Sequence, residues 1–331
     1  IMMSIALGLY WAVGSNMTIA PSQRLTDGAG YCVAHQQMFG IAVFSWLAKV
    51  LFGGKKGGET KKIEDVKLPG FMSIFNENMV ATTLIMTLFF GVILVALGGD
   101  YLHEKKLMGP NDNYLFFIML TAMKFSVWLA VLQLGVKTFV AELTESFQGI
   151  SNKWLPGAVP GVDCAAVYGF GSQNAITIGF VMGAIGQFIG LAVLLLVGSP
   201  VVVIAGFIPM FFDNATIALY ANRHGGYKAA FVLPLVSGIC QIFGTAFIVH
   251  WAIIAYNGMH VGLETGYLGM WDWAVIWPGF TWLMHNFAYI GFAVVVAILI
   301  LLPQLEYRRN PKGYFLIVDD YEEYKRQFPE Q

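Results

Sequence analysis

Residues 164–212 read CAAVYGFGSQNAITIGFVMGAIGQFIGLAVLLLVGSPVVVIAGFIPMFF and contain no Asp, Glu, Lys or Arg. A helix needs about 20 apolar residues to cross the hydrocarbon core of a bilayer. The run is therefore long enough to span a membrane and too long for a single crossing. Gly198-Ser199-Pro200 and the Gly206–Pro209 segment predict that it divides into one spanning helix and an irregular second piece.

The same absence of charge recurs along the chain. Uncharged stretches cover Met79–Gly99, Ala229–Leu263 and Trp273–Leu305, and Tyr114–Val136 contains one charged residue, Lys124. Hydrophobic residues make up 57% of the chain and charged residues 12%, against about 25% charged residues in soluble domains. This composition predicts an all-α, polytopic helical membrane protein with broken or re-entrant helices, rather than a large soluble core.

The predicted segments follow these apolar runs and the glycine and proline residues between them. Residues 1–305 are expected to form one membrane domain, followed by a polar tail at 306–331. Ile1–Val13 resembles the second part of a membrane helix, so we interpret the chain as beginning inside a helix. The remaining segments are a loop at 14–27, a Gly-interrupted helix at 28–52, helices at 79–99, 114–136, 227–256 and 274–302, and an amphipathic surface stretch at 136–153.

The placement of lysine and arginine predicts the orientation in the membrane. Five lysines lie in the segment 53–67 and five basic residues lie in the tail, whereas 257–272 contains neither Lys nor Arg. Cytoplasmic loops carry an excess of these two residue types. The 53–67 segment and the C-terminus are therefore expected on the cytoplasmic side.

Several function classes find no support in the chain. A net charge of −1 provides no basic face to neutralise the phosphates of a nucleic acid. The cysteines Cys32, Cys164 and Cys240 lack the spacing of a disulfide framework or a zinc site. No phosphate-binding loop or hydrolase motif is present. We therefore expect no catalytic residue, no metal and no cofactor, and we interpret Cys164 as a packing residue.

A weak internal repeat links two parts of the chain. The pattern G-F-x-x-[IM]-F-x-[ED]-N occurs at Gly70–Asn78 and again at Gly206–Asn214, 136 residues later. The same offset pairs Asp27 with Asp163 and Gln37 with Gln173. We interpret segments of about 20–99 and 156–256 as repeats. Repeats with short, Gly/Pro-broken segments point to the binding site of a transporter.

One group of candidate site residues lies in the first of these broken segments. Asp27 precedes Gly28, and the adjacent polar residues His35, Gln36 and Gln37 follow. A half-helix that starts at this glycine-rich point would present the positive end of its dipole to an anionic ligand. The alternative is hydrogen bonding between helices, which is common in membrane bundles.

Asp163 is the main candidate in the second segment. It follows a Pro-Gly-rich stretch and directly precedes the uncharged run. A carboxylate at such a position costs a few kcal/mol unless it is paired or hydrated, which makes it a functional-site hypothesis. The alternative is a helix N-cap at the membrane interface. Asn214 is a weaker site candidate, for which a cap at a helix start is the alternative.

Four segments resemble the ascorbate-specific IIC membrane component of the bacterial phosphoenolpyruvate-dependent sugar phosphotransferase system. They are TDGAGYCVAHQQMF from Thr26, LPGFMSIFNENMV from Leu68, VAELTESFQGISNKWLPGAVPGVDCAAVYGF from Val140 and GFIPMFFDNATIALYANRHGGYKAA from Gly206. The similarity covers most of the chain up to about residue 302. The N-terminal membrane segments of that family, which also line its substrate site, have no counterpart here.

The resemblance implies a multi-pass homodimer in the bacterial inner membrane, with a core domain, a V-shaped dimerisation domain and inverted repeats. It implies that this component binds and translocates L-ascorbate. A cytoplasmic IIB component, phosphorylated on cysteine and supplied by IIA, then phosphorylates the solute. By their position in the motifs, His35, Gln36 and Asp163 match the substrate site of the family.

Two alternatives stay open for the transported solute and its energy source. Galactitol carriers are related, and a hexitol would use the same hydrogen-bonding groups. An ion-coupled secondary transporter could use protonation of Asp163 or His35 at a similar site. An intramembrane enzyme is disfavoured because the sequence offers no convincing catalytic pair.

Overall fold

The computed structural model describes residues 1–53, 60–66, 78–155, 158–204, 206–255, 265–267, 269–309, 311 and 323. The predicted orientation rests mainly on 53–67 and 306–331, and nearly half of the first segment and most of the second lie outside the described residues. The same holds for Gly70–Glu77, which forms most of the first block of the predicted repeat.

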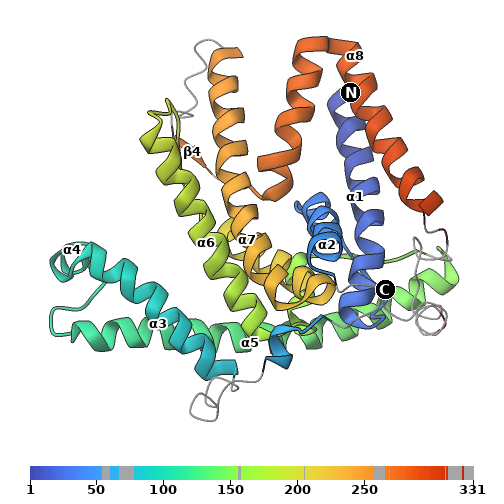
Figure 1. Ribbon diagram of the computed structural model, residues 1–331. Helices are drawn as coiled ribbons and strands as arrows, with labels where there is room; N and C mark the ends of the chain where they lie inside the picture. Colours follow the sequence, from blue (N-terminus) through green and yellow to red (C-terminus); the bar gives the residue numbers. More distant parts are fainter. Residues whose placement is uncertain are drawn as a thin grey trace.

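The described chain is built almost entirely from helices, with two pairs of very short strands (Figure 1). In order, the elements are α1 (Met2–Thr26), β1 (Cys32–Val33), α2 (Met38–Phe52), the 3-10 helix η2 (Ile63–Asp65), α3 (Asn78–Leu97), α4 (Gly99–Glu104), α5 (Tyr114–Lys153), β2 (Gly161–Val162), the 3-10 helix η4 (Cys164–Gly169), α6 (Gln173–Leu196), β3 (Val202–Ile204), the π-helix η5 (Pro209–Asp213), α7 (Asn214–Ala255), β4 (Thr265–Tyr267) and α8 (Trp271–Arg309).

Five helices in this part of the chain are long and apolar enough to cross a membrane. They contain Met79–Leu97, Tyr114–Phe147, Gln173–Leu196, Pro209–Trp251 and Trp271–Arg308. The prediction of an all-α, polytopic membrane protein is confirmed. The run 164–212 also divides as predicted, into the spanning helix α6 and an irregular piece that contains β3 and the π-helix η5.

Helix α1 contradicts the predicted loop at 14–27. The polar side chains in this stretch bond within the helix or to its neighbours. Thr26 donates from Oγ1 to the carbonyl of Ser22, and the buried Gln23 donates from Nε2 to the carbonyl of Tyr31 at 2.7 Å. Their polarity is therefore satisfied without a loop, and α1 ends only at Asp27, in the left-handed conformation.

The predicted helix at 28–52 is also shorter than expected. Gly28 and Gly30 have positive φ values of 90° and 75°, which a continuous helix does not allow. The chain then forms β1, which pairs in parallel with β2, so that Cys32 lies opposite Gly161. Helix α2 begins only at Met38. Residues 28–37 are therefore an irregular connection between α1 and α2.

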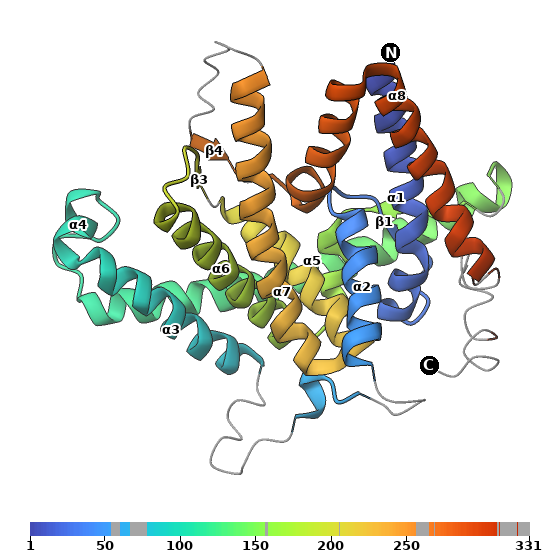
Figure 2. The ribbon, with the colours of Figure 1, turned by 45° about the horizontal axis from the view of Figure 1, so that its top comes forward.

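Helix α5 unites two segments that were predicted separately. It contains 40 residues, about 60 Å of helix, and includes both the predicted span at 114–136 and the amphipathic stretch at 136–153. It passes beneath the other helices, and α3 packs along one end of it to form a lateral arm (Figures 1 and 2). The separation of this stretch into a span and a surface segment was wrong.

Helices α7 and α8 are each broken by one residue with non-helical geometry. The break in α7 lies at Gly226, with φ 74°, so its second half begins where the helix at 227–256 was predicted. The break in α8 lies at Ala288, with φ 45°, and Figure 1 shows its two limbs turning back on each other. The helix predicted over 274–302 is therefore present, with a break within it.

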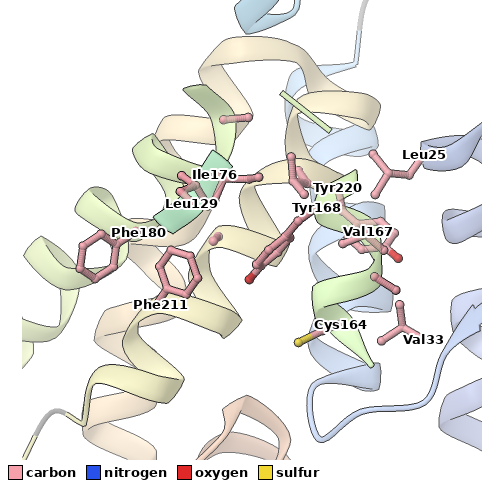
Figure 3. Close-up of a cluster of buried hydrophobic side chains, with 14 of the residues drawn as sticks. Leu25, Val33, Leu129, Cys164, Val167, Tyr168, Ile176, Phe180, Phe211 and Tyr220 are labelled. Atoms are coloured by element: carbon pink, nitrogen blue, oxygen red, sulfur yellow. The ribbon is translucent and has the colours of Figure 1, made fainter. Parts of the chain in front are cut away.

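The core of the described chain lies where α6 and α7 pack together, with aromatic side chains gathered beside η4 and η5. Phe180, Phe211 and Tyr168 lie in this cluster, and Tyr220 and Val33 extend it towards β1 (Figure 3). Small residues let the two helices approach closely, as is common in membrane bundles. A Cβ atom on Gly186 would come within 2.1 Å of the carbonyl oxygen of Leu235.

Helix α2 begins at Met38 and α6 begins at Gln173, 135 residues later, which is within one residue of the predicted offset. In addition, α2 packs against α7 and α3 packs against α6. This is the pattern expected if each helix of one repeat exchanges with its counterpart in the other. The repeat stays a prediction.

We expect Gly186→Ala to destabilise the protein by about 1–3 kcal/mol, because the added methyl group meets backbone that cannot move aside. Gly135→Ala is the matched control, since a Cβ atom there has nothing within 4 Å and alanine favours a helix. Thermal unfolding of both variants in detergent measures the difference. Equal transition temperatures for the two would contradict the role of this contact.

Candidate solute site

The β1–β2 pair brings the two main candidate residues together. His35 follows β1 and Asp163 follows β2, and His35 Nε2 lies 3.4 Å from Asp163 Oδ2. The two backbones are held by hydrogen bonds of 2.9 Å from Cys32 N–H to the Pro160 carbonyl and from Ala34 N–H to the Val162 carbonyl. The side chains are 23% and 60% exposed, so a solute can reach both.

Asp163 uses its two carboxylate oxygens differently. Oδ1 accepts the backbone N–H of Ala165 at 2.8 Å and thereby caps the 3-10 helix η4. The thiol of Cys164 donates to the same oxygen, at 3.6 Å. Oδ2 faces His35. The cap that was the alternative interpretation is therefore present, and it leaves the second oxygen for another partner.

His35 is held in its neutral form near pH 7. Burial lowers the pKa of its imidazole below the usual 6.5, and the neighbouring Asp163 opposes this by raising it. Its Nδ1 atom is buried and has no hydrogen-bond partner in the described part of the chain. A neutral imidazole has one donor and one acceptor nitrogen. His35 can therefore bind either a hydroxyl or an anionic oxygen of a solute.

Gln36 and Gln37 have different surroundings. The carbonyl of Gln36 accepts the N–H of Asp272 at 3.0 Å, and the residue is half-buried. Gln37 is fully buried, and its Nε2 lies 3.5 Å from the carbonyl oxygen of Phe212. Its Oε1 has no hydrogen-bond partner among the described residues. Gln37 therefore lies deeper than His35, with one acceptor atom unused.

The expected half-helix start at Gly28 is absent, and the N-terminus of α2 binds a side chain instead. Asp272 accepts the N–H groups of Phe39 and Gly40, at 3.0 and 2.9 Å, and the hydroxyl of Tyr10. The prediction that this helix end receives an anionic solute was therefore wrong. The residue was missed, although it is the single carboxylate between Glu264 and Glu306.

The two weaker candidates lie in structural contacts. Asp27 ends α1 and pairs with Arg223 at 3.2 Å. Asn214 is fully buried at the start of α7, where its Nδ2 lies 3.1 Å from the Met210 carbonyl and 3.2 Å from Gln241 Oε1. A solute cannot touch Asn214 in this conformation.

A buried polar network beside Asn214 was also missed. Gln241 donates to Asp213 Oδ2 at 2.6 Å and accepts from Gln187 at 2.9 Å, and all three side chains are fully buried. The contacts join α6, which contains Gln187, to η5, which contains Asp213, and to the second half of α7, which contains Gln241. The signal in the sequence was the presence of two amides within apolar runs, since such side chains need partners in a membrane.

These features define a polytopic helical membrane protein with a small, accessible polar site where two chain segments leave regular helix, an arrangement typical of transporters. The family of the PTS system sugar-specific permease component matches residues 1–278, and the chain belongs to it. The chain is also 35% identical over 281 residues to the ascorbate-specific PTS system EIIC component of Mycoplasma pneumoniae (strain ATCC 29342 / M129 / Subtype 1), a match that covers 78% of this chain. The chain spans 42% of the length of that curated relative.

We expect Asp272→Ala to destabilise the protein strongly, because it leaves two backbone N–H groups and the Tyr10 hydroxyl without their buried acceptor. Asp272→Asn keeps one acceptor oxygen and should lose less stability. Thermal unfolding in detergent ranks the three proteins. An alanine variant as stable as the parent would show that α2 does not depend on this cap.

Proposed function

We propose that this protein binds L-ascorbate and translocates it into the cytoplasm as the IIC component of a phosphotransferase system. The observation that carries the proposal is the exposed His35–Asp163 pair, 3.4 Å apart, within segments that the resemblance assigns to the substrate site. The specificity of the Mycoplasma relative supports ascorbate as the solute.

The chemistry of the pair suits this solute. Ascorbate is a flat, hydroxyl-rich monoanion at neutral pH. Neutral His35 and the amide of Gln36 can donate to its anionic oxygens, while Asp163 Oδ2 accepts its hydroxyls. Gln37 is fully buried, so its Oε1 would reach the solute only in another conformation of the protein. Asp27 and Asn214, given their contacts here, would take part only in another conformation of the protein.

The partners follow from the same proposal. A cytoplasmic IIB component phosphorylates the solute and is itself supplied by IIA, so this chain needs no catalytic residue, metal or cofactor of its own. We place the protein in the bacterial inner membrane with its C-terminus in the cytoplasm. A homodimer would form along the arm of α3 and α5, where large apolar side chains such as Leu88, Phe116 and Trp128 are exposed.

The proposed domain organisation is a single transporter domain over residues 1–305, with repeats at about 20–99 and 156–256, and a polar tail at 306–331. The packing of α2 against α7 and of α3 against α6 supports the repeat. Galactitol as solute and ion-coupled transport remain the alternatives, since the donors and acceptors of the site do not distinguish a hexitol from ascorbate.

Uptake by the full-length protein in vesicles separates these alternatives. We expect labelled ascorbate to accumulate as its phosphate when IIA, IIB and phosphoenolpyruvate are present, with excess unlabelled ascorbate competing and galactitol not. Accumulation of unmodified solute driven by a proton gradient alone would instead establish an ion-coupled transporter. Competition by galactitol alone would assign the other solute.

We expect Asp163→Asn to bind ascorbate about 10- to 150-fold more weakly, because a charge-assisted hydrogen bond contributes roughly 1.5–3 kcal/mol. Asparagine is as good an N-cap as aspartate, so η4 and the fold should persist. Binding is measured by calorimetry, and folding by size-exclusion chromatography in detergent. Full affinity for ascorbate in a folded variant would show that Asp163 serves only as a helix cap.

A further inference from the structure

Three different metal-ligating side chains meet at the β1–β2 pair. His35 Nε2, a carboxylate oxygen of Asp163 and Cys164 Sγ all lie within 4.8 Å of one another. Imidazole nitrogen, thiolate sulfur and carboxylate oxygen are the ligand types that zinc uses in proteins. The group combines one exposed, one half-buried and one buried residue, so an ion could enter from the Asp163 side.

The separations fit a zinc ion with little rearrangement. Bonds from zinc to nitrogen, oxygen and sulfur of about 2.0–2.3 Å place tetrahedral ligand atoms about 3.3–3.7 Å apart. The distance from His35 Nε2 to Asp163 Oδ2 is 3.4 Å, and that from Cys164 Sγ to Asp163 Oδ1 is 3.6 Å. The first value is that expected for two ligands of one ion. The second joins Sγ to Oδ1, the oxygen that caps η4, and Sγ lies within 4.8 Å of the other two ligand atoms.

The local fold holds these three donors in place. The β1–β2 pairing fixes the positions of His35 and Asp163 relative to each other, and Cys164 is the first residue of η4. The cap from Asp163 to Ala165 uses Oδ1, so Oδ2 can bind a cation while η4 stays capped. Three protein ligands leave a fourth position of a tetrahedral ion open to water.

We propose that His35, Asp163 and Cys164 form an inhibitory zinc site. A bound ion occupies His35 Nε2 and Asp163 Oδ2, the atoms assigned to the solute, and therefore excludes the solute. Binding of the metal requires only the geometry of the three side chains. The competition with ascorbate rests, in addition, on the proposed function.

Cobalt substitution in the full-length protein tests the metal site without any solute. Co²⁺ bound to a thiolate gives a charge-transfer absorption band in the near ultraviolet. We expect this band in the parent protein and in Cys240→Ala, which removes a cysteine outside the cluster, and its loss in Cys164→Ala. Zn²⁺ should abolish the band by displacement. No band in the parent protein, or a band that survives in Cys164→Ala, would overturn the site.

Asp163→Asn provides a second variant that keeps the cap on η4. It replaces an anionic ligand with a neutral amide, so we expect Co²⁺ and Zn²⁺ to bind at least about tenfold more weakly, measured by titration of the band or by calorimetry. Unchanged metal affinity in this folded variant would also overturn the site.

Competition is measured last, with ascorbate titrated against bound Zn²⁺. We expect each ligand to raise the apparent dissociation constant of the other. Metal binding without such competition would overturn the overlap and place the solute elsewhere, whereas absence of metal binding beside normal ascorbate transport would overturn only the zinc site.

Discussion

The candidate site depends on a pair of strands only two residues long. In a helical membrane protein, each helix satisfies its own backbone, and chain that leaves a helix must find other partners. Here two such segments satisfy each other, because Cys32 and Ala34 donate to carbonyls at Pro160 and Val162. That pairing is parallel and fixes the residues that follow each strand, His35 and Asp163, side by side.

The helical class and the residue types of the site were predictable from the sequence. Hydropathy identifies the existence of α3 and α6 and the ends of both helices near residues 97 and 196, because a run of apolar residues has one stable state in a bilayer. His35 and Asp163 stood out because polar groups are costly among apolar neighbours. That the two face each other depends on a backbone pairing between distant segments, and local patterns carry no information about it.

The errors concern where helices begin, end and break. The predicted loop at 14–27 treated polar side chains as exposed, whereas Gln23 and Thr26 bond to nearby carbonyls. The start of α2 depends on Asp272, far along the chain. The break in α8 lies at Ala288, ten residues after Pro278, although proline is the residue type that usually breaks a helix. The start of α2 is decided by a partner far outside the window that a sequence pattern covers.

The cap on α2 also sets an order of events during synthesis. Gly40 and its acceptor Asp272 are separated by 232 positions, and Phe39 and Asp272 by 233. Until the ribosome has released residue 272, the first amides of α2 lack this acceptor, and the segment before α2 lacks β2 until residue 162 has emerged. These amides must therefore remain in contact with water or with the insertion machinery until their acceptors have been made.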